Sequence, residues 1–443
     1  MTPITTLQNW IGSKIGFSET SYTRMDLELY QLENLQRTIQ YARNRSPFYK
    51  QLFSHSPEIP QCLKDLTLYP FTFSKDITAD PGRFVCVSQD AIQRIVTLPT
   101  MGTTGPSKRV FFTADDQELT IDFFQVGMAN LARPGDKVLI LLPGERPGSV
   151  GDLLAIGLKR LGCIPYQYGP VDGEQKLLEY IQMIGINVLV GAPVHIYRLA
   201  CWDEYLHILI PGQIRSVLTS TDYLPRIVNT NIQRIWGCEI FDHYGMTESG
   251  LGGGVECAAH QGYHLREADL LYEIVNPVTG LPETDGSYGE VVLTTLTRTG
   301  MPLIRYRTED ISRFIPGNCS CGSFIKRLEQ IKTRIHTSVY LNSKPIDQSE
   351  LDEALFRIDG LSDFSAVFED DSLSLNLRLV NGTIEGVRKA VLSALSNVPT
   401  LQPEMGAGKI QVVLTRVEDN PHFETGSIAK RRIMDKRILF QHR

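Results

Sequence analysis

The fold class is decided by the stretch Lys137-Val-Leu-Ile-Leu-Leu-Pro143, an apolar run of strand length that opens a series of alternating segments. Helical periodicity follows over Val150–Leu161 and again over Lys176–Ile184, and a second apolar strand, Asn187-Val-Leu-Val-Gly191, comes after them. Strands that are apolar on both faces and separated by helices belong to parallel sheets that are covered on both sides. This region therefore predicts an α/β fold with a mostly parallel sheet.

Upstream of this region, Leu and Tyr recur at three- and four-residue spacing over residues 25–55, which predicts a long helix. Pro47 ends that helix or starts a second short one, because proline disfavours helical geometry in the residue before it. Downstream, we interpret Arg234-Ile-Trp-Gly-Cys-Glu-Ile240 as a strand that delivers a loop beginning at Phe241.

Beyond about residue 265 the pattern changes to alternating strands at Leu270–Val275 and Gly289–Thr295, which predict an antiparallel subdomain with hairpins. The C-terminal part mixes helices with alternating strands, as a small α+β domain of about 100 residues does. We therefore expect a large N-terminal domain over residues 1–332, with mostly parallel sheets plus the antiparallel subdomain. A small α+β domain is expected over residues 333–443.

Composition argues against several classes of protein. The 443 residues carry a formal net charge of −6, which gives no reason to expect nucleic acid or an anionic membrane as a partner. No apolar run approaches the ~18–20 residues that span a bilayer, and the N-terminus lacks the pattern of a signal peptide, so a cytoplasmic location is expected. The 8 cysteines are too sparse for a disulfide scaffold, which fits a reducing compartment.

The sharpest local motif is Thr100-Met-Gly-Thr-Thr-Gly-Pro-Ser-Lys-Arg-Val110, which follows a strand-like stretch at Arg94–Leu98. Glycines let backbone N–H groups converge on an anion, threonine hydroxyls add donors, and Lys108 or Arg109 supplies positive charge. The spacing is not that of a Walker A loop. A phosphate-binding loop and a Gly/Thr-rich surface turn both account for this stretch when it is taken alone.

Two further motifs lie downstream. In Phe241-Asp-His-Tyr-Gly-Met-Thr-Glu248 an aromatic ring can stack on a base, a threonine can bond a phosphate and a carboxylate can hold Mg²⁺. In Pro302-Leu-Ile-Arg-Tyr-Arg-Thr-Glu-Asp310 an acidic residue can hold both hydroxyls of a ribose. Taken alone, the two motifs favour a capped turn at a strand end and a salt-bridged surface strand.

Together, in this order and spacing, the three motifs resemble those of the adenylate-forming superfamily, which includes acyl-CoA synthetases, peptide-synthetase adenylation domains and luciferases. The resemblance is closest to the phenylacetate-CoA ligase branch, and it extends to Ser46-Pro-Phe-Tyr49 and Pro70-Phe-Thr-Phe-Ser-Lys-Asp76. It covers residues 25–330 and is thinner in the C-terminal part.

The resemblance implies roles for individual residues. The loop from Thr100 to Lys108 wraps the ATP phosphates, Tyr244 stacks on adenine, and Asp310 holds the ribose hydroxyls. The implied catalytic residues are Thr247, which contacts the phosphates, Glu248, which holds Mg²⁺, and Lys430. The implied nucleotide-binding residues are Thr100, Gly102, Thr103, Thr104, Gly105, Lys108, Ser220, Thr221, Asp222, His243, Tyr244, Gly245, Thr247, Arg307, Asp310 and Arg334.

The chain departs from the family's pattern in several places. Met101 stands where Ser or Thr is usual, and Ser220-Thr-Asp222 replaces Gly-Ala-Glu. Thr333-Arg-Ile-His-Thr337 replaces Gly-Arg-x-Asp-Asp, so the acidic hinge residue is absent. Ser427 follows the glycine where the family carries a lysine, and Lys430 is either the lysine that reaches the same place or part of a solvated tail.

A second kind of site is indicated by Cys319-Ser-Cys-Gly322, together with Cys257 and either His260 or His264. Thiolate and imidazole are ligands that Zn²⁺ prefers, and four of them close a structural site with no position left for substrate. Similar spacing in some members of the resembled branch favours His264. Three unpaired cysteines in loops are the alternative. The predicted Zn²⁺ ligands are Cys257, His264, Cys319 and Cys321.

The resemblance implies an AMP-forming acid–CoA ligase that uses ATP, Mg²⁺ and CoA. Its substrate would be an aryl or similar carboxylic acid, activated through an acyl-AMP intermediate. Two alternatives stay open: an adenylating enzyme with another acceptor, such as a carrier protein or a cofactor as in F390 synthetase relatives, and a nucleotide-binding protein with impaired catalysis. The altered hinge and lysine motifs keep the last one open. Relatives are often dimers, so a homodimer is a further expectation.

Overall fold

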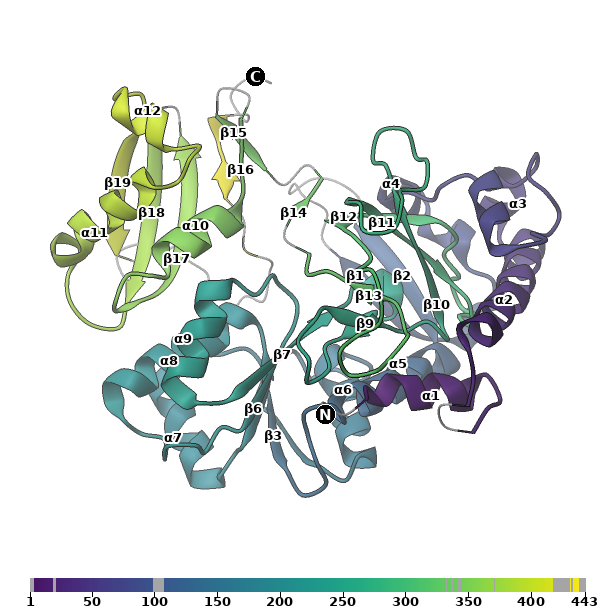
Figure 1. Ribbon diagram of the computed structural model, residues 1–443, viewed down its shortest axis with the longest axis horizontal. Helices are drawn as coiled ribbons and strands as arrows, with labels where there is room; N and C mark the ends of the chain where they lie inside the picture. The colour runs from purple at the N-terminus through teal and green to yellow at the C-terminus, as the bar shows by residue number, and fades with distance from the viewer. Residues whose placement is uncertain are drawn as a thin grey trace. The chain divides into compact units, whose positions relative to one another are not determined.

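The structure is a computed structural model that describes residues 4–18, 21–98, 107–331, 333–335, 338–341, 344–369, 371–416, 431 and 433–437. Its elements are shown along the chain in Figure 1. The chain forms two compact units, each built from separate stretches of sequence. Unit 1 consists of Met1–Gly135, Glu145–Cys163 and Phe241–Ile331, and unit 2 of Asp136–Gly144, Ile164–Ile240 and Lys332–Arg443.

The helices of unit 1 begin at side-chain caps that the sequence supplies. Thr23 accepts a hydrogen bond from the backbone N–H of Asp26 at the start of α2, and Ser46 accepts one from Tyr49 at the start of α3. Pro47 therefore starts a second short helix, as one of the two predicted outcomes had it. The helices are α1 (Thr6–Lys14), α2 (Arg24–Arg45), α3 (Pro47–Leu52), α4 (Ser74–Ala79), α5 (Ala114–Met128) and α6 (Val150–Arg160), with 3₁₀ turns at Leu63–Leu68, Pro81–Phe84, Gln89–Ala91 and Thr247–Ser249.

The strand pairs within unit 1 that the structure describes are antiparallel, and the alternating pattern beyond about residue 265 predicts this for Leu270–Val275 and Gly289–Thr295. β1 (Ile92–Leu98) pairs with β2 (Lys108–Thr113), and β10 (Leu270–Val275), β11 (Gly289–Thr295) and β12 (Tyr306–Ser312) form consecutive antiparallel pairs. A third group pairs in the order β7, β8, β9 and β13. Its bounds are β7 (Glu239–Tyr244), β8 (Gly254–Val255), β9 (Tyr263–Leu265) and β13 (Arg327–Leu328).

Unit 2 contains the parallel sheet that the opening stretch predicts. β3 (Lys137–Ile140) lies between β4 (Ile164–Gln167) and β5 (Val188–Gly191), and β6 (Ser216–Thr219) pairs with β5, all in parallel. The apolar side chains of these strands share one core with the helices α7 (Glu174–Ile184), α8 (Pro193–Leu206) and α9 (Arg226–Trp236). Burial on both sides explains why the strands are apolar without alternation.

The strand interpreted at residues 234–240 is wrong in its first half. Arg234, Ile235 and Trp236 end the helix α9, the chain turns at Gly237 with φ of 66°, and β7 begins at Glu239. The helix is favoured over a strand at these residues because Ile232 and Trp236, at four-residue spacing, are both buried. In addition, the Trp236 indole N–H donates a hydrogen bond of 2.9 Å to the Asp203 carboxylate.

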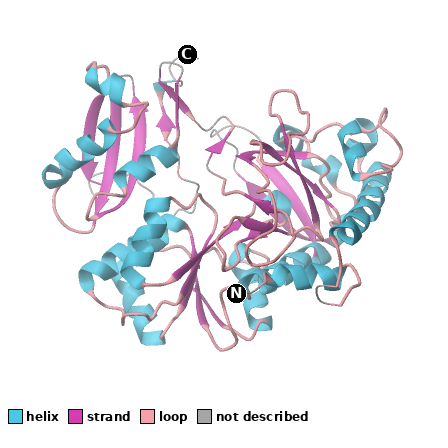
Figure 2. Ribbon diagram, in the orientation of Figure 1, coloured by secondary structure: helices cyan, strands magenta, loops and turns pink. Residues whose placement is uncertain are grey.

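The C-terminal part of unit 2 has the α+β character expected from the sequence. Its sheet has the strand order β19-β18-β17-β20, and Figure 2 shows it flanked by helices. The elements are β14 (Thr333–Arg334), β15 (Val339–Leu341), β16 (Lys344–Ile346), α10 (Gln348–Leu355), β17 (Leu361–Glu369), β18 (Ser372–Leu379), α11 (Ile384–Ser396), α12 (Gln402–Gly406), β19 (Gln411–Arg416) and β20 (Met434–Asp435). The predicted fold class, α/β with parallel and antiparallel sheets and an α+β C-terminal part, is confirmed. Within the part of the chain that the structure describes, every helix is too short or too polar to cross a membrane.

Tyr49 joins the N-terminal helices to the antiparallel sheet of unit 1. Its fully buried hydroxyl accepts the backbone N–H of Ile304 at 2.9 Å and lies 3.1 Å from the Thr72 hydroxyl. We expect Tyr49→Phe to lower the free energy of unfolding by about 1–3 kcal/mol, because the Ile304 N–H would be buried without a partner. Tyr288→Phe is the control, since that side chain is 52% exposed. Equal shifts of the two variants in thermal unfolding would contradict the assignment.

Candidate active site

The predicted phosphate-binding motif lies partly outside the described residues. Thr100, Gly102, Thr103, Thr104 and Gly105 all belong to the stretch 99–106, which the structure does not describe. The two strands that flank this stretch form a hairpin, with Leu98 opposite Lys108. Lys108, the first residue of β2, is therefore the predicted loop residue that the structure places.

Lys108 meets Glu248 in a cluster whose members come from four segments: α4, β2, the turn after β7, and β12. The Lys108 ammonium forms an ion pair with the Glu248 carboxylate and lies 3.3 Å from both the Tyr306 hydroxyl and the Ser74 hydroxyl. The Tyr306 hydroxyl also donates to Glu248 Oε1 at 2.9 Å. One carboxylate oxygen thus receives a cation from β2 and a neutral donor from β12.

The environment of Glu248 keeps its carboxyl group ionised. The side chain is 6% exposed, and burial alone raises its pKa. The ion pair with Lys108, together with hydrogen bonds from Lys108 and Tyr306, outweighs burial and lowers the pKa below its ordinary value. An ionised carboxylate is the hard oxygen ligand that Mg²⁺ takes beside phosphates. The residues present therefore fit this ion.

The turn that carries Glu248 depends on Gly245. β7 ends at Tyr244, and Thr247–Ser249 form a 3₁₀ turn in which the Ser249 hydroxyl accepts the Met246 N–H at 3.2 Å. A Cβ atom on Gly245 would lie 2.4 Å from the Leu251 carbonyl oxygen, so no other residue fits without moving the backbone. This tight turn places Thr247 and Glu248 directly after the strand.

Tyr244 and Asp310 are in direct contact. The Tyr244 hydroxyl donates to Asp310 Oδ2 at 2.9 Å, and its ring stacks on Tyr263 with centroids 5.9 Å apart. Burial and the Asp310 charge raise the pKa of Tyr244 well above its ordinary value, so the phenol stays protonated. The aromatic residue and the acidic residue, predicted from two separate motifs, are thus brought together by β7 and β12.

His243 lies in an aromatic environment on the same strand. Its ring centroid lies 6.0 Å from that of Phe123 and 6.2 Å from that of Phe124, both on α5. Burial lowers the pKa of His243 to about 4, so the imidazole is neutral at physiological pH. The second motif therefore carries a neutral imidazole among aromatic rings at His243 and a charged carboxylate at Glu248.

Arg307 is not part of this group. Its guanidinium forms an ion pair with Glu290 and lies over the rings of Phe71 and Phe73, at 5.3 and 5.6 Å from their centroids. Along β12 the buried residues alternate with partly exposed ones, and Arg307 falls between the buried Tyr306 and Thr308. The alternation of a strand explains why Tyr306, rather than Arg307, reaches Glu248.

The remaining predicted residues belong to unit 2 or are not described. Ser220 follows β6, where its N–H donates to the Gly191 carbonyl at 3.0 Å, and Thr221 has a positive φ of 78°. The Asp222 carboxylate accepts the backbone N–H groups of Tyr223 and Arg431, both at 2.9 Å. Arg334 lies on β14, and Lys430 is among the residues that the structure does not describe.

The predicted metal ligands come together in unit 1. The ligand atoms of Cys257, His264, Cys319 and Cys321 all lie within 4.8 Å of one another, and all four residues are buried. Burial, followed by the charge of Arg327, lowers the pKa of His264 to about 4, so its imidazole is available as a neutral ligand. Three thiols and one imidazole at these distances fit a tetrahedral Zn²⁺ ion. His260 lies outside this group, with Nδ1 3.3 Å from the Glu256 carboxylate.

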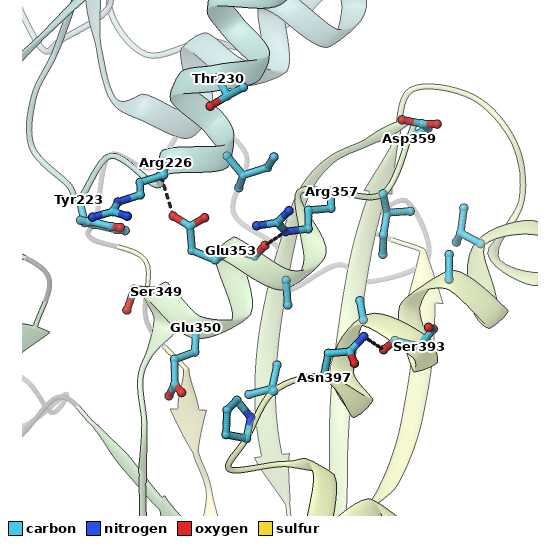
Figure 3. Close-up of a pocket in the computed structure, with 18 of the residues that line it drawn as sticks. Tyr223, Arg226, Thr230, Ser349, Glu350, Glu353, Arg357, Asp359, Ser393 and Asn397 are labelled. Carbon is cyan, nitrogen blue, oxygen red and sulfur yellow. Dashed lines mark hydrogen bonds between the residues drawn. The ribbon is translucent and has the colours of Figure 1, made fainter.

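Unit 2 also has a pocket of about 1300 Å³ along α9, α10 and α11 (Figure 3). Of the predicted site residues that the structure describes, none lines it. Polar groups at its wall are paired with one another: the Arg226 backbone N–H donates to Glu353 at 2.6 Å, and Asn397 donates to the Ser393 carbonyl at 2.9 Å.

Sequence reasoning missed Tyr306 and Ser74 as members of the Lys108 cluster. Both stand within quoted motifs, Pro302–Asp310 and Pro70–Asp76, but no spacing rule singled them out. The alternation of residues 306, 308 and 310 on one strand was the signal that could have placed Tyr306 beside Asp310.

We expect Lys108→Met to destabilise the protein by roughly 3 kcal/mol near neutral pH, since it leaves the Glu248 carboxylate buried without its cation. The pKa of Glu248 then rises, because burial is no longer opposed by the ion pair. In the wild type the stability from this carboxylate is present above the unfolded pKa and is lost on acidification. In the variant, protonation of Glu248 removes the unpaired buried charge, so the difference in thermal stability between variant and wild type shrinks as pH falls. Lys108→Met/Glu248→Gln is the control and should cost less than Lys108→Met; a pH-independent difference would contradict the prediction.

Comparison with known proteins identifies the family of this chain. The family described as AMP-binding enzyme matches residues 56–296. The chain is similar to a phenylacetate-coenzyme A ligase of Pseudomonas putida, at 27% identity over 391 residues, which covers 84% of this chain and 86% of that protein. It is 30% identical over 305 residues to a phenylacetate-coenzyme A ligase of Aromatoleum evansii, which covers 66% of this chain and 67% of that protein.

Solved structures share the fold. The crystal structure of 2-hydroxyisobutyryl-CoA ligase in the postadenylation state matches with a TM-score of 0.78 at 21% identity, over 95% of this chain and 92% of that one. The anthranilate CoA ligase AuaEII in complex with anthranoyl-AMP matches with a TM-score of 0.51 at 14% identity, over 75% and 65%. With a family match over more than half of its length and motifs in the expected order, the chain belongs to the AMP-binding enzyme family, in the phenylacetate-CoA ligase-like branch of the adenylate-forming superfamily.

Proposed function

We propose that this protein is an AMP-forming acid–CoA ligase. A carboxylate oxygen of the acid attacks the α-phosphorus of ATP, the bond to pyrophosphate breaks, and acyl-AMP forms. The CoA thiol then attacks the acyl carbon, AMP leaves and the thioester is released. The observation that carries this proposal is the Lys108–Glu248–Tyr306 cluster beside the Tyr244–Asp310 contact, in a chain of this family.

The chemistry needs positive charge near phosphate oxygens and little covalent participation by the protein. Lys108 supplies a cation at the end of the phosphate motif, and Glu248 would hold Mg²⁺, which neutralises charge on the phosphates when it is bound. Thr247 offers a hydroxyl in the same turn. The roles of Thr100, Gly102, Thr103, Thr104 and Gly105 in wrapping the phosphates belong to this proposal.

The nucleoside half of ATP is assigned to Tyr244 and Asp310. Asp310 already accepts one hydrogen bond from the Tyr244 hydroxyl, and a carboxylate has further acceptor sites for the two ribose hydroxyls. Tyr244 presents an aromatic ring for adenine. We assign Ser220, Thr221, Asp222, His243 and Gly245 to the surroundings of the nucleotide, together with Arg307 and Arg334, on the resemblance alone.

The acid is proposed to be aryl or similar, in keeping with relatives that are named phenylacetate-coenzyme A ligases. Phe123 and Phe124 contact the neutral His243 and make its surroundings aromatic, which supports this assignment. We further propose that residues 1–332 carry the nucleotide and acid sites, and that residues 333–443 act as a small mobile domain that delivers Lys430.

Two other functions remain as alternatives. An acceptor other than CoA, such as a carrier protein or a cofactor, would leave the first half-reaction unchanged. A nucleotide-binding protein with impaired catalysis is favoured by one observation, since Ser427 stands where the resembled family carries its C-terminal lysine. ATP binding without turnover would identify that case.

The test is ATP–pyrophosphate exchange over a panel of aryl and aliphatic acids, followed by thioester formation on addition of CoA. We expect exchange with at least one aryl acid and a CoA thioester in the second step. Exchange without a thioester would point to another acceptor. Binding of ATP without exchange for any acid would overturn the catalytic proposal.

Two variants identify the residue that replaces the family's lysine. Lys430→Ala should slow formation of acyl-AMP by about 100-fold or more, as expected for loss of a group that stabilises transferring charge. The thioester step from preformed acyl-AMP should be retained. Ser427→Ala is the matched control, and a selective loss in that variant instead would assign the role to Ser427.

We also propose that Cys257, His264, Cys319 and Cys321 hold a structural Zn²⁺ ion. The supporting observation is the mutual distance of their ligand atoms, which include a Cys257–Cys319 sulfur separation of 3.8 Å and a Cys321 sulfur to His264 Nε2 distance of 3.6 Å. A closed set of four protein ligands leaves no position for substrate, so the ion would stabilise the fold.

Metal analysis of the purified protein should find about one Zn²⁺ per chain. Cys321→Ser should lose the metal and lower the unfolding temperature, because metal binding free energy contributes to folding. Cys62→Ser is the control, since Cys62 is exposed and lies outside the cluster. Retention of full zinc content by Cys321→Ser would contradict the assignment.

The remaining expectations from the sequence stay predictions. A homodimer is tested by light scattering during gel filtration. A cytoplasmic location and the absence of nucleic-acid and membrane partners are tested by fractionation and by binding assays.

A further inference from the structure

Arg298 is a buried arginine. Its guanidinium contacts the turn that carries Glu248 and the strand that carries Lys108. The residue is 6% exposed, and it belongs to none of the predicted site residues. Its Nη1 donates to the backbone carbonyl of Glu248 at 2.8 Å, and its Nη2 donates to the backbone carbonyl of Phe111 at 3.3 Å. One guanidinium therefore ties the turn that carries Glu248 to the strand that begins at Lys108.

The two carbonyls lie close to the charged pair along the chain. Glu248 offers its carboxylate to Lys108 and its own carbonyl to Arg298. Phe111 follows Lys108 by three residues on β2, which is roughly 10 Å along a strand. A shift of the 3₁₀ turn against β2 would therefore move the Glu248 carboxylate relative to the Lys108 ammonium.

The chain that follows Arg298 is fixed by Asp116. The Asp116 carboxylate accepts the backbone N–H groups of Thr299 at 2.8 Å and Gly300 at 3.0 Å, and also that of Thr113 at 3.0 Å. Thr113 caps α5 and ends β2. Asp116 thus holds the backbone of the 299–300 segment to the same strand that the Arg298 side chain contacts.

Removing this guanidinium from water costs free energy, so filling space in the core does not account for an arginine at this position. Burial lowers the pKa of Arg298, and the charges of Asp116 and Glu248 oppose that shift. Within the part of the chain that the structure describes, its Nε has no hydrogen-bond partner, although the Phe112 ring lies 4.3 Å from the guanidinium carbon. An apolar side chain of similar length would fill the space without desolvating a charge. The planar fork is what reaches two carbonyls on different segments at once.

We infer that Arg298 is a positioning residue that sets the Glu248 carboxylate for Mg²⁺ by clamping the Thr247–Ser249 turn to β2. The inference rests on the proposed function, in which Glu248 holds the ion beside the ATP phosphates. Groups that orient a metal ligand without touching the metal change metal affinity by about 10–100-fold. Arg298 therefore acts on the part of ATP affinity that depends on Mg²⁺.

The experiment measures the dissociation constant of ATP by calorimetry, with Mg²⁺ and with a chelator. The ratio of the two values reports how much Mg²⁺ strengthens binding. In Arg298→Lys and Arg298→Met we expect that ratio to fall by about 10-fold, with ATP binding in the chelator unchanged. Arg298→Lys keeps the positive charge but loses the planar guanidinium that reaches two carbonyls. It gives the Mg²⁺ ratio for the test if Arg298→Met does not fold.

Arg266→Lys is the matched control. Arg266 is also buried and lines the same cavity of about 20 Å³ as Arg298, but its guanidinium contacts Asp269 and the Leu119 carbonyl. It should lose stability without changing the Mg²⁺ ratio. An equal fall of the ratio in Arg266→Lys, or an unchanged ratio in Arg298→Lys, would show a purely structural role and overturn the inference.

A double variant tests whether Arg298 acts through Glu248. Glu248→Gln should remove the Mg²⁺ effect, and Arg298→Lys should then have no further effect on the ratio, because coupled residues are not additive. Additive effects would overturn the inference. These measurements need neither acid nor CoA, so a protein that activates no acid would contradict the proposed function while the binding ratio still decides the role of Arg298.

Discussion

The buried carboxylate of Glu248 imposes the constraint on which the candidate site depends. A charge that is removed from water needs a partner, and Lys108 provides it from a position 140 residues away in the chain. Because Lys108 starts β2 and Glu248 follows β7, their ion pair fastens two separate elements of unit 1 at one point. Tyr306 adds a third element, since its hydroxyl donates to the same carboxylate oxygen.

The neighbouring groups are arranged around that point in two chemical environments. Tyr244 and Asp310 form a buried pair in which a neutral phenol donates a hydrogen bond to a carboxylate. His243 lies in a different environment. It contacts two phenylalanine rings, and it is neutral because burial lowers its pKa. A single strand, β7, thus separates polar from apolar chemistry at adjacent residues, because successive side chains point to opposite faces.

Local pattern predicted much of the fold, since periodicity depends on neighbours in the chain. Leu270–Val275 and Gly289–Thr295 are strands with the predicted bounds. The pattern failed at residues 234–236, where the helix is supported by burial of Ile232 and Trp236 on one face and by the hydrogen bond from Trp236 to Asp203, 33 residues away. Within the site, motifs identified Lys108, Tyr244, Glu248 and Asp310, but they gave no reason to separate Tyr306 from Arg307 on β12.

The sequence by itself determined which kinds of side chain are available and in what order: a Gly/Thr-rich motif ending in a lysine, an aromatic residue before a carboxylate, an acidic residue on a later strand, and a Cys/His set. Only the tertiary structure decided which of these side chains contact one another. Lys108 pairs with Glu248, Arg307 pairs with Glu290, and His264 rather than His260 joins the cysteines. The physical reason is that ion pairs, hydrogen bonds and ligand sets depend on distances of a few ångströms in space, and spacing along the chain does not encode those distances across a sheet.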